Sequence, residues 1–315
     1  MSSSGEREME MTVLDRIVEK REISEQWVSV NGELVPKHEA SVSIYDHGFL
    51  YGDGAFEGIR VYNGNIFRLV PHLQRLYRSV KALGFELDKN LDQFQSDVVS
   101  TVRANSHYDG YIRVTVSRGV GLGLDPKHLG TKPTTIISTE QLRLYPQEMY
   151  DNGLTVITAS TRVPPPVCID PQVKTTGKYI NSISAKMEAN RVGAGEALML
   201  NMAGNVAEAT GDNVFFVRNG EVVTPPTSEG ALPGITRATV MEICKESGIP
   251  CREAVTTLFD IYMADEAFLT GTAAEVIPMV VLDEKTIGDG KPGAITNKII
   301  NRFRQLTLTD GVRID

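Results

Sequence analysis

Lys174 is the residue of this sequence best placed to act as an amine nucleophile. It ends an irregular, proline-rich segment and precedes a Thr-Thr-Gly turn that leads into a predicted helix. The positive end of a helix and partial burial would both lower the pKa of its amine from roughly 10.4, which suits attack by a neutral amine on an aldehyde. A surface lysine is the ordinary alternative. Lys178, which opens the helix, and Lys186, within it at a more solvated position, are local rivals.

Two turns could present backbone amides to an anion. Residues 232–237 lead directly into a helix: Gly234 permits a tight turn, Thr236 can cap, and the amides of Ile235 and Thr236 would point at the anion. Residues 271–275, Gly-Thr-Ala-Ala-Glu, lie between two apolar strands, where small residues let a ligand approach the backbone closely. An ordinary capped helix and a tight turn or bulge are the alternatives.

Charged side chains could complete such a site. Glu208 follows a turn and could hold a proton on a pyridine nitrogen, which makes the ring an electron sink. Arg75, on a predicted helix, could clamp a phosphate bidentately, and Arg113, which alternates with Tyr111 on a strand, could bind a carboxylate. An exposed strand glutamate and surface arginines are the alternatives. His47 beside Asp46 suggests a general base, but no nucleophile motif accompanies it.

The bulk composition narrows the class of protein. The 315 residues are 41% hydrophobic, which suits two ordinary domains or one large one, and the net charge of -8 argues against nucleic acid or an anionic membrane as main partner. The three cysteines, without C-x-x-C spacing, predict reduced and mostly buried thiols, and five scattered histidines make a metal site improbable. Because neither a membrane-length apolar run nor an apolar signal core is present, a cytoplasmic enzyme is expected.

The elements that must position these residues are strands paired by hairpins, with helices between groups. Asn-Gly pairs at residues 31–32, 63–64 and 219–220 predict tight turns between antiparallel strands, and residues 111–117 and 134–138 read as further strands. Helices are predicted over residues 71–83, 179–192 and 236–247, with a short amphipathic helix near residues 13–18 after a flexible tail. Residues 141–152 separate two such groups. The pattern predicts an α+β protein.

Taken in order, these blocks resemble the class IV aminotransferases, the fold type IV pyridoxal-phosphate enzymes, and within them the branched-chain amino acid aminotransferases. The resemblance runs from about Trp27 to the C-terminus. It rests on GFLYGDGAFEGIR (48–60), HLQRL (72–76), YIR (111–113), the Lys174 segment, and residues 208–213, 232–237 and 271–275. It implies two α+β domains, residues 25–140 and 150–315, joined by a linker at 141–149 and preceded by a tail at 1–24, with pyridoxal 5'-phosphate between the domains.

The resemblance also implies roles for individual residues. Lys174 resembles the lysine that carries the cofactor and serves as general base and acid. The other implied cofactor contacts are Tyr179 to the phenolic oxygen, Glu208 to the ring nitrogen, and Arg75, Ile235, Thr236 and Thr272 to the phosphate. Thr272 and Ala273 would present amides to the substrate carboxylate, and Tyr51, Phe56, Gly58, Arg60, Tyr111 and Arg113 would line the substrate side. Family members are at least homodimers, in which the loop around Leu122–Leu124 reaches the neighbouring active site, so Leu124 joins the substrate set.

The implied reaction is ping-pong transamination between leucine, isoleucine or valine and 2-oxoglutarate. Three positions depart from the family pattern: Lys178 where asparagine is frequent, Val114 where proline is common, and an interdomain loop without tryptophan. On the same fold, a D-amino acid or (R)-amine transaminase and an aminodeoxychorismate-lyase-like enzyme are the alternatives. A phosphate-ligand-binding module without catalysis is the alternative from another class of protein.

Overall fold

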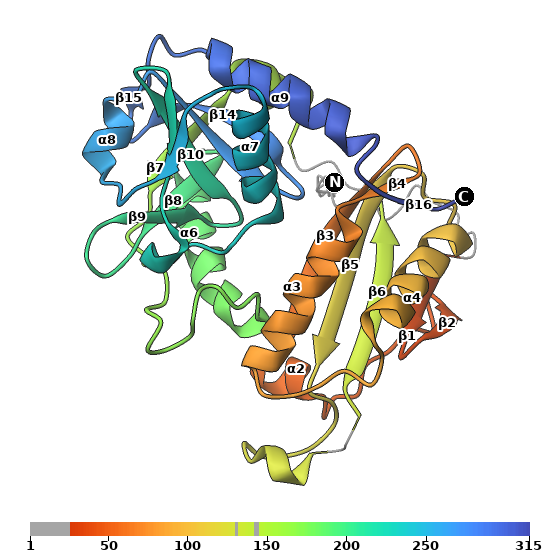
Figure 1. The fold of residues 1–315 in the computed structure, drawn as a ribbon. Coiled ribbons are helices and arrows are strands. Elements are labelled where there is room, and N and C mark those ends of the chain that lie inside the picture. The colour runs from red at the N-terminus through yellow and green to blue at the C-terminus, as the bar shows by residue number, and fades with distance from the viewer. Residues whose placement is uncertain (1–25, 130–131, 142–144) are drawn as a thin grey trace, which may run out of the picture.

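The computed structural model describes residues 26–129, 132–141 and 145–315, and two sheets form its framework (Figure 1). The first sheet is antiparallel, with the order β16-β4-β3-β5-β6-β1-β2. Its strands are β1 (Trp27–Val30), β2 (Glu33–Pro36), β3 (Gly54–Tyr62), β4 (Asn65–Phe67), β5 (Gly110–Ser117), β6 (Thr134–Glu140) and β16 (Gly311–Arg313). The short helix α2 (His47–Tyr51) precedes β3.

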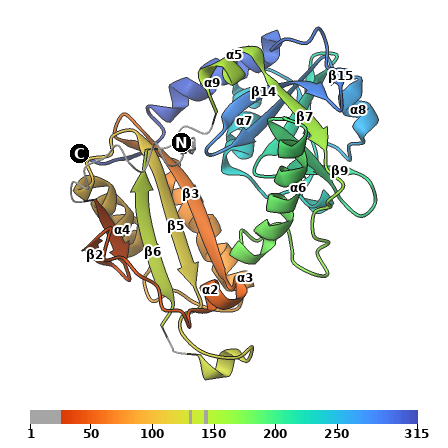
Figure 2. The same cartoon turned by 180° about the vertical axis from the view of Figure 1, so that it is seen from behind.

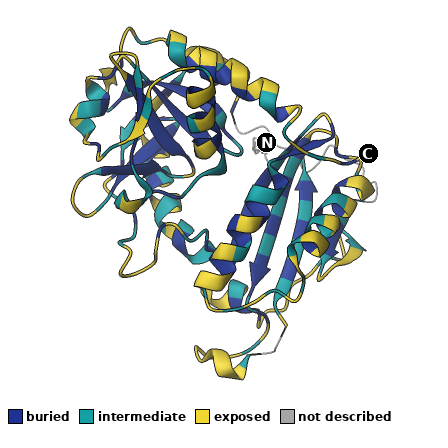
Figure 3. Ribbon diagram, in the orientation of Figure 1, coloured by how far each residue is buried: buried dark blue, intermediate teal, exposed yellow. Residues whose placement is uncertain are grey.

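Two helices, α3 (Leu69–Ala82) and α4 (Leu91–Ala104), cover one face of this sheet (Figure 1). Leu69, Leu73, Leu76 and Val80 of α3 recur at helical spacing and are all buried against the sheet. Figure 3 shows the outward faces of both helices exposed, whereas the residues of β5 and β6 beneath them alternate between buried and intermediate. From behind, no described helix lies over β3, β5 and β6 (Figure 2).

The second sheet is mixed and has nine strands, in the order β12-β11-β10-β13-β14-β7-β8-β9 with β15 paired to β14. Its strands are β7 (Leu154–Thr158), β8 (Glu196–Leu200), β9 (Val206–Ala209), β10 (Asn213–Arg218), β11 (Glu221–Thr224), β12 (Cys251–Glu253), β13 (Glu266–Gly271), β14 (Glu275–Leu282) and β15 (Lys285–Thr286). The helices are α5 (Gln147–Asn152), α6 (Tyr179–Arg191), α7 (Ile235–Glu246), α8 (Leu258–Tyr262) and α9 (Ala294–Thr307). Phe215 and Phe268 stack between this sheet and helices α7 and α9.

Most elements expected from sequence are present. All three Asn-Gly pairs are the turns of antiparallel hairpins, and their asparagines adopt the positive φ that such turns require. Helix α3 begins two residues before the prediction, and α6 and α7 end one residue before it. The prediction that Thr236 caps α7 is wrong, because Gly234 is the capping residue and supplies no side-chain hydrogen bond.

Other expectations differ from the structure. The predicted linker region contains the start of α5, because residues from Gln147 form a helical turn that packs on β14. The last strand, β16, pairs with β4 of the first sheet. Residues 311–313 therefore belong to the first sheet, although the sequence places them in the second domain. Cys168 is exposed and Cys251 is half-buried, so only Cys244 fits the expectation of buried thiols. The predicted tail and helix at residues 13–18 lie outside the described residues. Within the described part, no helix is long and apolar enough to cross a membrane.

Candidate active site

Lys174 lies where the two sheets meet, fixed by its backbone. Its carbonyl accepts a hydrogen bond from the Phe56 amide of β3 at 3.1 Å, and its own amide donates to Ser79 Oγ of α3 at 3.1 Å. The following Thr175 forms a bridge with Ala55, and its hydroxyl donates to the carbonyl of Gly54 at 2.8 Å. These contacts hold the irregular segment before α6 against the first sheet, so the position of Lys174 is set by tertiary contacts.

The Lys174 amine points into an aromatic and charged surrounding. Its Nζ donates to the Tyr179 hydroxyl at 3.0 Å and lies 4.8 Å from the centre of the Phe56 ring. Burial and the nearby Arg75 guanidinium lower the pKa of Lys174 to about 8. Burial raises the pKa of Tyr179 to about 12, so the phenol keeps its proton. A large share of Lys174 is therefore a neutral amine near pH 8.

The two rival lysines are engaged elsewhere. Lys178 is buried, and its Nζ donates to the Pro171 carbonyl at 2.7 Å and to Glu208 Oε1 at 3.0 Å. Lys186 donates to the Gly195 carbonyl and lies 3.7 Å from Glu196 Oε2. An ammonium paired with a carboxylate in this way is a poor nucleophile. Of the three lysines, Lys174 is the one whose contacts suit covalent chemistry.

Glu208, on β9, faces the same space and joins it to the turn before α7. Its Oε2 accepts from the backbone amide of Leu232 at 2.7 Å and from Asn213 Nδ2 at 3.4 Å. Asn213 also donates to the Leu232 carbonyl at 2.9 Å. The glycine at 234 is required here, because a Cβ at that position would overlap Asn213 Oδ1. The carboxylate is thus supported on one side by the turn that leads into α7.

Arg75 reaches this turn from the opposite side. Its Nε and Nη2 donate to the two oxygens of Glu57 at 2.7 and 2.8 Å, and its Nη1 donates to the Pro233 carbonyl at 2.9 Å. His72 Nδ1 lies 2.8 Å from the same Glu57 carboxylate. Burial alone would raise the pKa of Glu57, but the ion pair with Arg75 lowers it to about 2. The guanidinium has five N–H groups, so two remain for a ligand.

The turn between these residues can bind an anion. Gly234 caps α7 without a side-chain hydrogen bond, so among the described residues no side chain caps the first amides of the helix, at Ile235 and Thr236. Arg75 stands beside them through its bond to Pro233. A guanidinium with free N–H groups beside an open helix N-terminus is suited to a phosphate. Together with the Lys174 amine and the Glu208 carboxylate, the donor set fits a phosphorylated pyridine aldehyde.

The turn that contains Thr272 and Ala273 joins β13 and β14, with Gly271 opposite Glu275. The pairing of Asn213 with Thr270 places this turn beside the segment that carries Glu208. Gly271 packs on the Asp212 carboxylate, where a Cβ would overlap Oδ1. Burial and the charge of Glu196 raise the pKa of Asp212 to about 7, and the charges of Lys186 and Lys174 oppose this shift.

The predicted substrate residues of β3 and β5 share one face of the first sheet. In the antiparallel register, Gly58 lies opposite Arg113 and Arg60 opposite Tyr111. Gly58 makes room for the Tyr111 ring, whose hydroxyl would overlap a Cβ at that position. The Arg113 guanidinium lies 3.6 Å from the centre of the Phe56 ring, and its Nε donates to Thr115 Oγ1 at 3.3 Å. Arg60 lies farther along β3, where its Nη2 is 3.9 Å from Glu275 Oε1.

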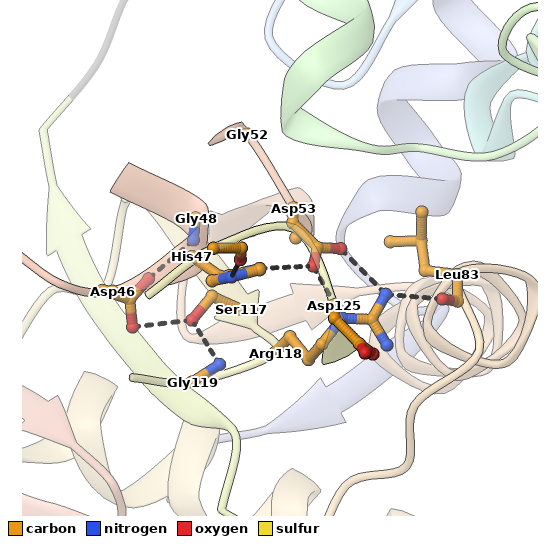
Figure 4. A network of polar contacts seen from close by, with 12 residues as sticks. Asp46, His47, Gly48, Gly52, Asp53, Leu83, Ser117, Arg118, Gly119 and Asp125 are labelled. Carbon is orange, nitrogen blue, oxygen red and sulfur yellow. Dashed lines mark hydrogen bonds and ion pairs between the residues drawn. The ribbon is translucent and has the colours of Figure 1, made fainter. Parts of the chain in front are cut away.

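Tyr51 and Leu124 lie at the surface rather than against Lys174. Tyr51 is 45% exposed at the end of α2, and Leu124 is 78% exposed in the loop after β5. A polar network joins α2 to the end of β5 (Figure 4): His47 Nδ1 lies 3.0 Å from Asp53 Oδ2, and Arg118 Nε donates to the same oxygen at 2.6 Å. His47 Nε2 lies 2.9 Å from the Gly123 carbonyl, which ties the Leu124 loop to α2. The histidine pairs with Asp53, not with the adjacent Asp46.

The structure therefore brings Lys174, Tyr179, Phe56, Arg75 and Glu208 together with the start of α7. The sequence reading missed the residues that hold them: Glu57, His72, Ser79 and Asn213. The signal for two of these was present, since His72 and Ser79 stand three residues before and four residues after Arg75 on one helix face. No local pattern marks Glu57 or Asn213 as partners of residues distant in sequence.

Comparison with known proteins identifies the family. The pattern of the family described as Amino-transferase class IV matches residues 54–281. A putative branched-chain-amino-acid aminotransferase of Methanocaldococcus jannaschii is 42% identical over 288 residues, which cover 91% of this chain and 98% of that protein. The branched-chain amino acid aminotransferase of Escherichia coli has a crystal structure with a TM-score of 0.87 and 34% identity, covering 90% of this chain and 95% of that one. The T.th. branched-chain amino acid aminotransferase, solved with pyridoxamine 5'-phosphate, has a TM-score of 0.86 and 33% identity, covering 93% and 100%.

These matches confirm the predicted α+β fold and the predicted enzyme class. The expectation of pyridoxal 5'-phosphate as cofactor is likewise confirmed at the level of the family, and the donor set around Lys174 fits it. The chain belongs to the class IV aminotransferases.

Proposed function

We propose that the protein transfers the amino group of L-leucine, L-isoleucine or L-valine to 2-oxoglutarate by a ping-pong route. The observation that carries this proposal is the Lys174 amine, held 3.0 Å from Tyr179, with a pKa lowered to about 8. The relatives and solved structures named above, which are described as branched-chain aminotransferases, support the choice of substrate.

Five parts of the chain would hold the cofactor. Arg75 and the amides of Ile235 and Thr236 bind its phosphate, with the Thr272 hydroxyl as a further donor. Tyr179 donates to its phenolic oxygen, and Glu208 accepts a hydrogen bond from its protonated ring nitrogen. When bound, pyridoxal phosphate supplies a carbonyl for the amino group and a ring that delocalises the electrons left by the departing α-proton.

Lys174 is the residue that transfers the α-proton of the amino acid substrate. Its Nζ, once free of the cofactor, accepts the α-proton of the amino acid and delivers it as general acid. A pKa of about 8 suits both tasks, because it lies close enough to neutral pH for the charged form to predominate while a usable fraction of the amine is neutral. The 2-oxo acid product leaves before 2-oxoglutarate binds, so both substrates use one pocket.

The substrate pocket joins an apolar wall to a polar rim. Phe56 and the ring of Tyr111 provide apolar surface for a branched side chain, and each buried methylene contributes roughly 0.8 kcal/mol. The turn at residues 271–275 presents the amides of Thr272 and Ala273 to the α-carboxylate. Arg113, which stacks on Phe56, is placed to bind the distal carboxylate of glutamate, with the hydroxyls of Tyr51 and Tyr111 and the more distant Arg60 assisting.

A second copy of the chain would complete the site. Phe49 of α2 is 72% exposed, and Leu122 and Leu124 of the neighbouring loop are 65% and 78% exposed. Apolar side chains gathered on one surface favour association. In the proposed homodimer the Leu122–Leu124 loop contacts the partner's substrate pocket. The contacts of His47 with Asp53 and with the Gly123 carbonyl hold that loop against α2. Size-exclusion chromatography with light scattering would return a monomer mass if this part of the proposal is wrong.

A panel of half-reactions tests the substrate assignment. L-leucine, D-alanine and (R)-1-phenylethylamine are added separately to the cofactor-loaded enzyme, and the loss of the visible absorption band is followed. L-leucine is expected to react fastest. A faster reaction with either of the others would exclude the branched-chain assignment, and release of pyruvate from aminodeoxychorismate without an amino acceptor would indicate lyase chemistry.

A further inference from the structure

Lys178 makes a buried ion pair beside Lys174 that the proposed reaction does not use. Its Nζ donates to Glu208 Oε1 at 3.0 Å and to the Pro171 carbonyl at 2.7 Å. The side chains of Lys178 and Glu208 are 3% and 9% exposed. Both charges have therefore lost nearly all their water, and each depends on the other for compensation.

The other groups around Glu208 do not replace this cation. The second carboxylate oxygen accepts from two neutral donors, the Leu232 amide and Asn213 Nδ2. The charges of Arg75 and Lys174 and the Tyr179 phenol act on Glu208 only through space, and Asp212 adds a nearby carboxyl group. Among the described residues, Lys178 is the one full positive charge in hydrogen-bond contact with Glu208.

We propose that Lys178 is a positioning residue that keeps Glu208 ionised and oriented before the cofactor binds. The inference rests on the proposed role of Glu208 at the ring nitrogen. A buried carboxylate that loses its counter-ion takes up a proton more readily, and a protonated Glu208 would not accept the ring N–H in the same way. Lys178 also links β9, through Glu208, to Pro171 and thus to the segment that ends in Lys174.

The geometry favours this role over simple packing. A space-filling residue at position 178 needs no charge, whereas this ammonium has two acceptors at hydrogen-bond distance in a site with little water. Lys178 lies one residue before Tyr179, so its anchoring also fixes the start of α6, from which Tyr179 reaches Lys174. The ion pair thereby couples the residue at the ring nitrogen to the residue at the phenolic oxygen.

The test compares the wild type with Lys178→Met, Lys178→Arg, Glu208→Gln and the Lys178→Met/Glu208→Gln double variant. Apo-protein is titrated with pyridoxal 5'-phosphate at acidic, neutral and alkaline pH, and binding is read from the visible absorption band. Lys178→Met should lose about tenfold or more in affinity, corresponding to about 1.4 kcal/mol. The loss should be largest at acidic pH, where Glu208 without its counter-ion takes up a proton. Lys178→Arg should recover most of the affinity.

Thermal unfolding of the apo-proteins provides a readout that needs no cofactor. Lys178→Met should lower the melting temperature in the wild-type background, because it leaves a buried carboxylate unpaired. In the Glu208→Gln background the ammonium is already unpaired, so the same substitution should be neutral or stabilising. Additive effects of the two substitutions on melting temperature, or a loss of affinity that is equal at every pH and not recovered by arginine, would overturn the inference.

These outcomes separate the inference from the proposed function. If wild-type protein fails to bind the cofactor, the proposed function is wrong, while the melting temperatures still report whether Lys178 and Glu208 are coupled. If wild-type and Lys178→Met bind it equally, the assignment of Lys178 is wrong and the proposed function stands.

Discussion

The Glu57 carboxylate holds the Arg75 guanidinium in a bidentate ion pair, with distances of 2.7 and 2.8 Å, in a place closed to solvent. Arg75 is thereby aimed at Pro233 and the start of α7, although it comes from a helix on the other sheet. The phosphate site proposed for this enzyme thus depends on a residue of β3 that would touch no phosphate itself.

Glu57→Gln is expected to destabilise the apo-protein at neutral pH by about 3 kcal/mol, because it leaves a buried guanidinium without its counter-ion. The pKa of Glu57 is lowered from 4.5 to about 2, so its stabilisation is complete above pH 4.5 and is lost as the pH falls toward 2. Urea unfolding at pH 7 and pH 3 measures the free energy of unfolding, and the difference between variant and wild type should be smaller at pH 3.

The exposed Glu33→Gln is the matched control, and it should not change the free energy of unfolding at either pH. A difference between Glu57→Gln and wild type that stays constant with pH would contradict the ion-pair account.

Lys174→Ala should reduce turnover to background and leave the cofactor bound non-covalently. Borohydride reduction of the wild-type enzyme followed by peptide mapping should place the pyridoxyl label on Lys174, since Lys178 and Lys186 are engaged with carboxylates and carbonyls. Lys186→Ala is the control and should keep the label at Lys174. A label on Lys178 or Lys186 would reject the assignment.

The rate at which apo-protein links covalently to pyridoxal should rise with pH, reach half its maximum near the Lys174 pKa of about 8, and level off roughly one pH unit higher. The reactive form is the neutral amine, and burial together with Arg75 lowers the pKa of Lys174 from 10.5 to about 8. Pyridoxal lacks the phosphate, so Arg75→Gln can be compared without loss of a phosphate contact, and it should move the midpoint upward. A rate that keeps rising toward pH 10 in the wild type would show that the amine is unperturbed.

Asp212→Asn should stabilise the apo-protein at pH 8 by roughly 1–3 kcal/mol and have little effect below pH 4. Burial and Glu196 raise the pKa of Asp212 from 3.8 to about 7, so the folded protein binds this proton more tightly than the unfolded chain. Stability contributed by the protonated form is therefore lost as pH rises from about 4 through 7. Denaturant unfolding at the two pH values measures the effect, with Asp289→Asn on the exposed turn before α9 as control. Destabilisation at pH 8 would contradict this placement of Asp212.

Local patterns in the sequence account for much of the fold. The Asn-Gly turns could be predicted because the conformation of a tight hairpin restricts which residues occupy it. Helix α3 could be predicted because its apolar residues recur at helical spacing. The pairing of β16 with β4 joins residues more than two hundred positions apart, and no local pattern encodes such a contact.

The residues of the candidate site likewise fall into two groups: those that a local sequence pattern indicates and those that it does not. Lys174 and the start of α7 carry local signals: a turn into a helix in one case and a glycine before a helix in the other. Glu57, Asn213 and the Lys178–Glu208 pair act through partners distant in the chain, so only the three-dimensional arrangement reveals them. Tyr51 and Leu124 were expected at the substrate, and their exposure in a single chain leaves that expectation to be tested in the proposed dimer.

Arg113→Ala should impair L-glutamate and 2-oxoglutarate more than L-leucine. The guanidinium stacks on Phe56 at 3.6 Å and uses only its Nε, toward Thr115, so its terminal nitrogens have no hydrogen-bond partner among the described residues. A hydrogen bond from a charged donor contributes about 1.5–3 kcal/mol, which predicts a loss of roughly 10- to 150-fold in kcat/KM for glutamate. Leucine has no distal carboxylate, so its half-reaction should change by only a few-fold through the altered packing on Phe56.

The control variant is Arg113→Lys, which keeps the charge without the stacked guanidinium plane. Its kcat/KM for glutamate should lie between the values of the wild type and of Arg113→Ala. Single-turnover rates with both amino acids decide the matter, and equal losses for the two would assign Arg113 to packing rather than to recognition of the distal carboxylate.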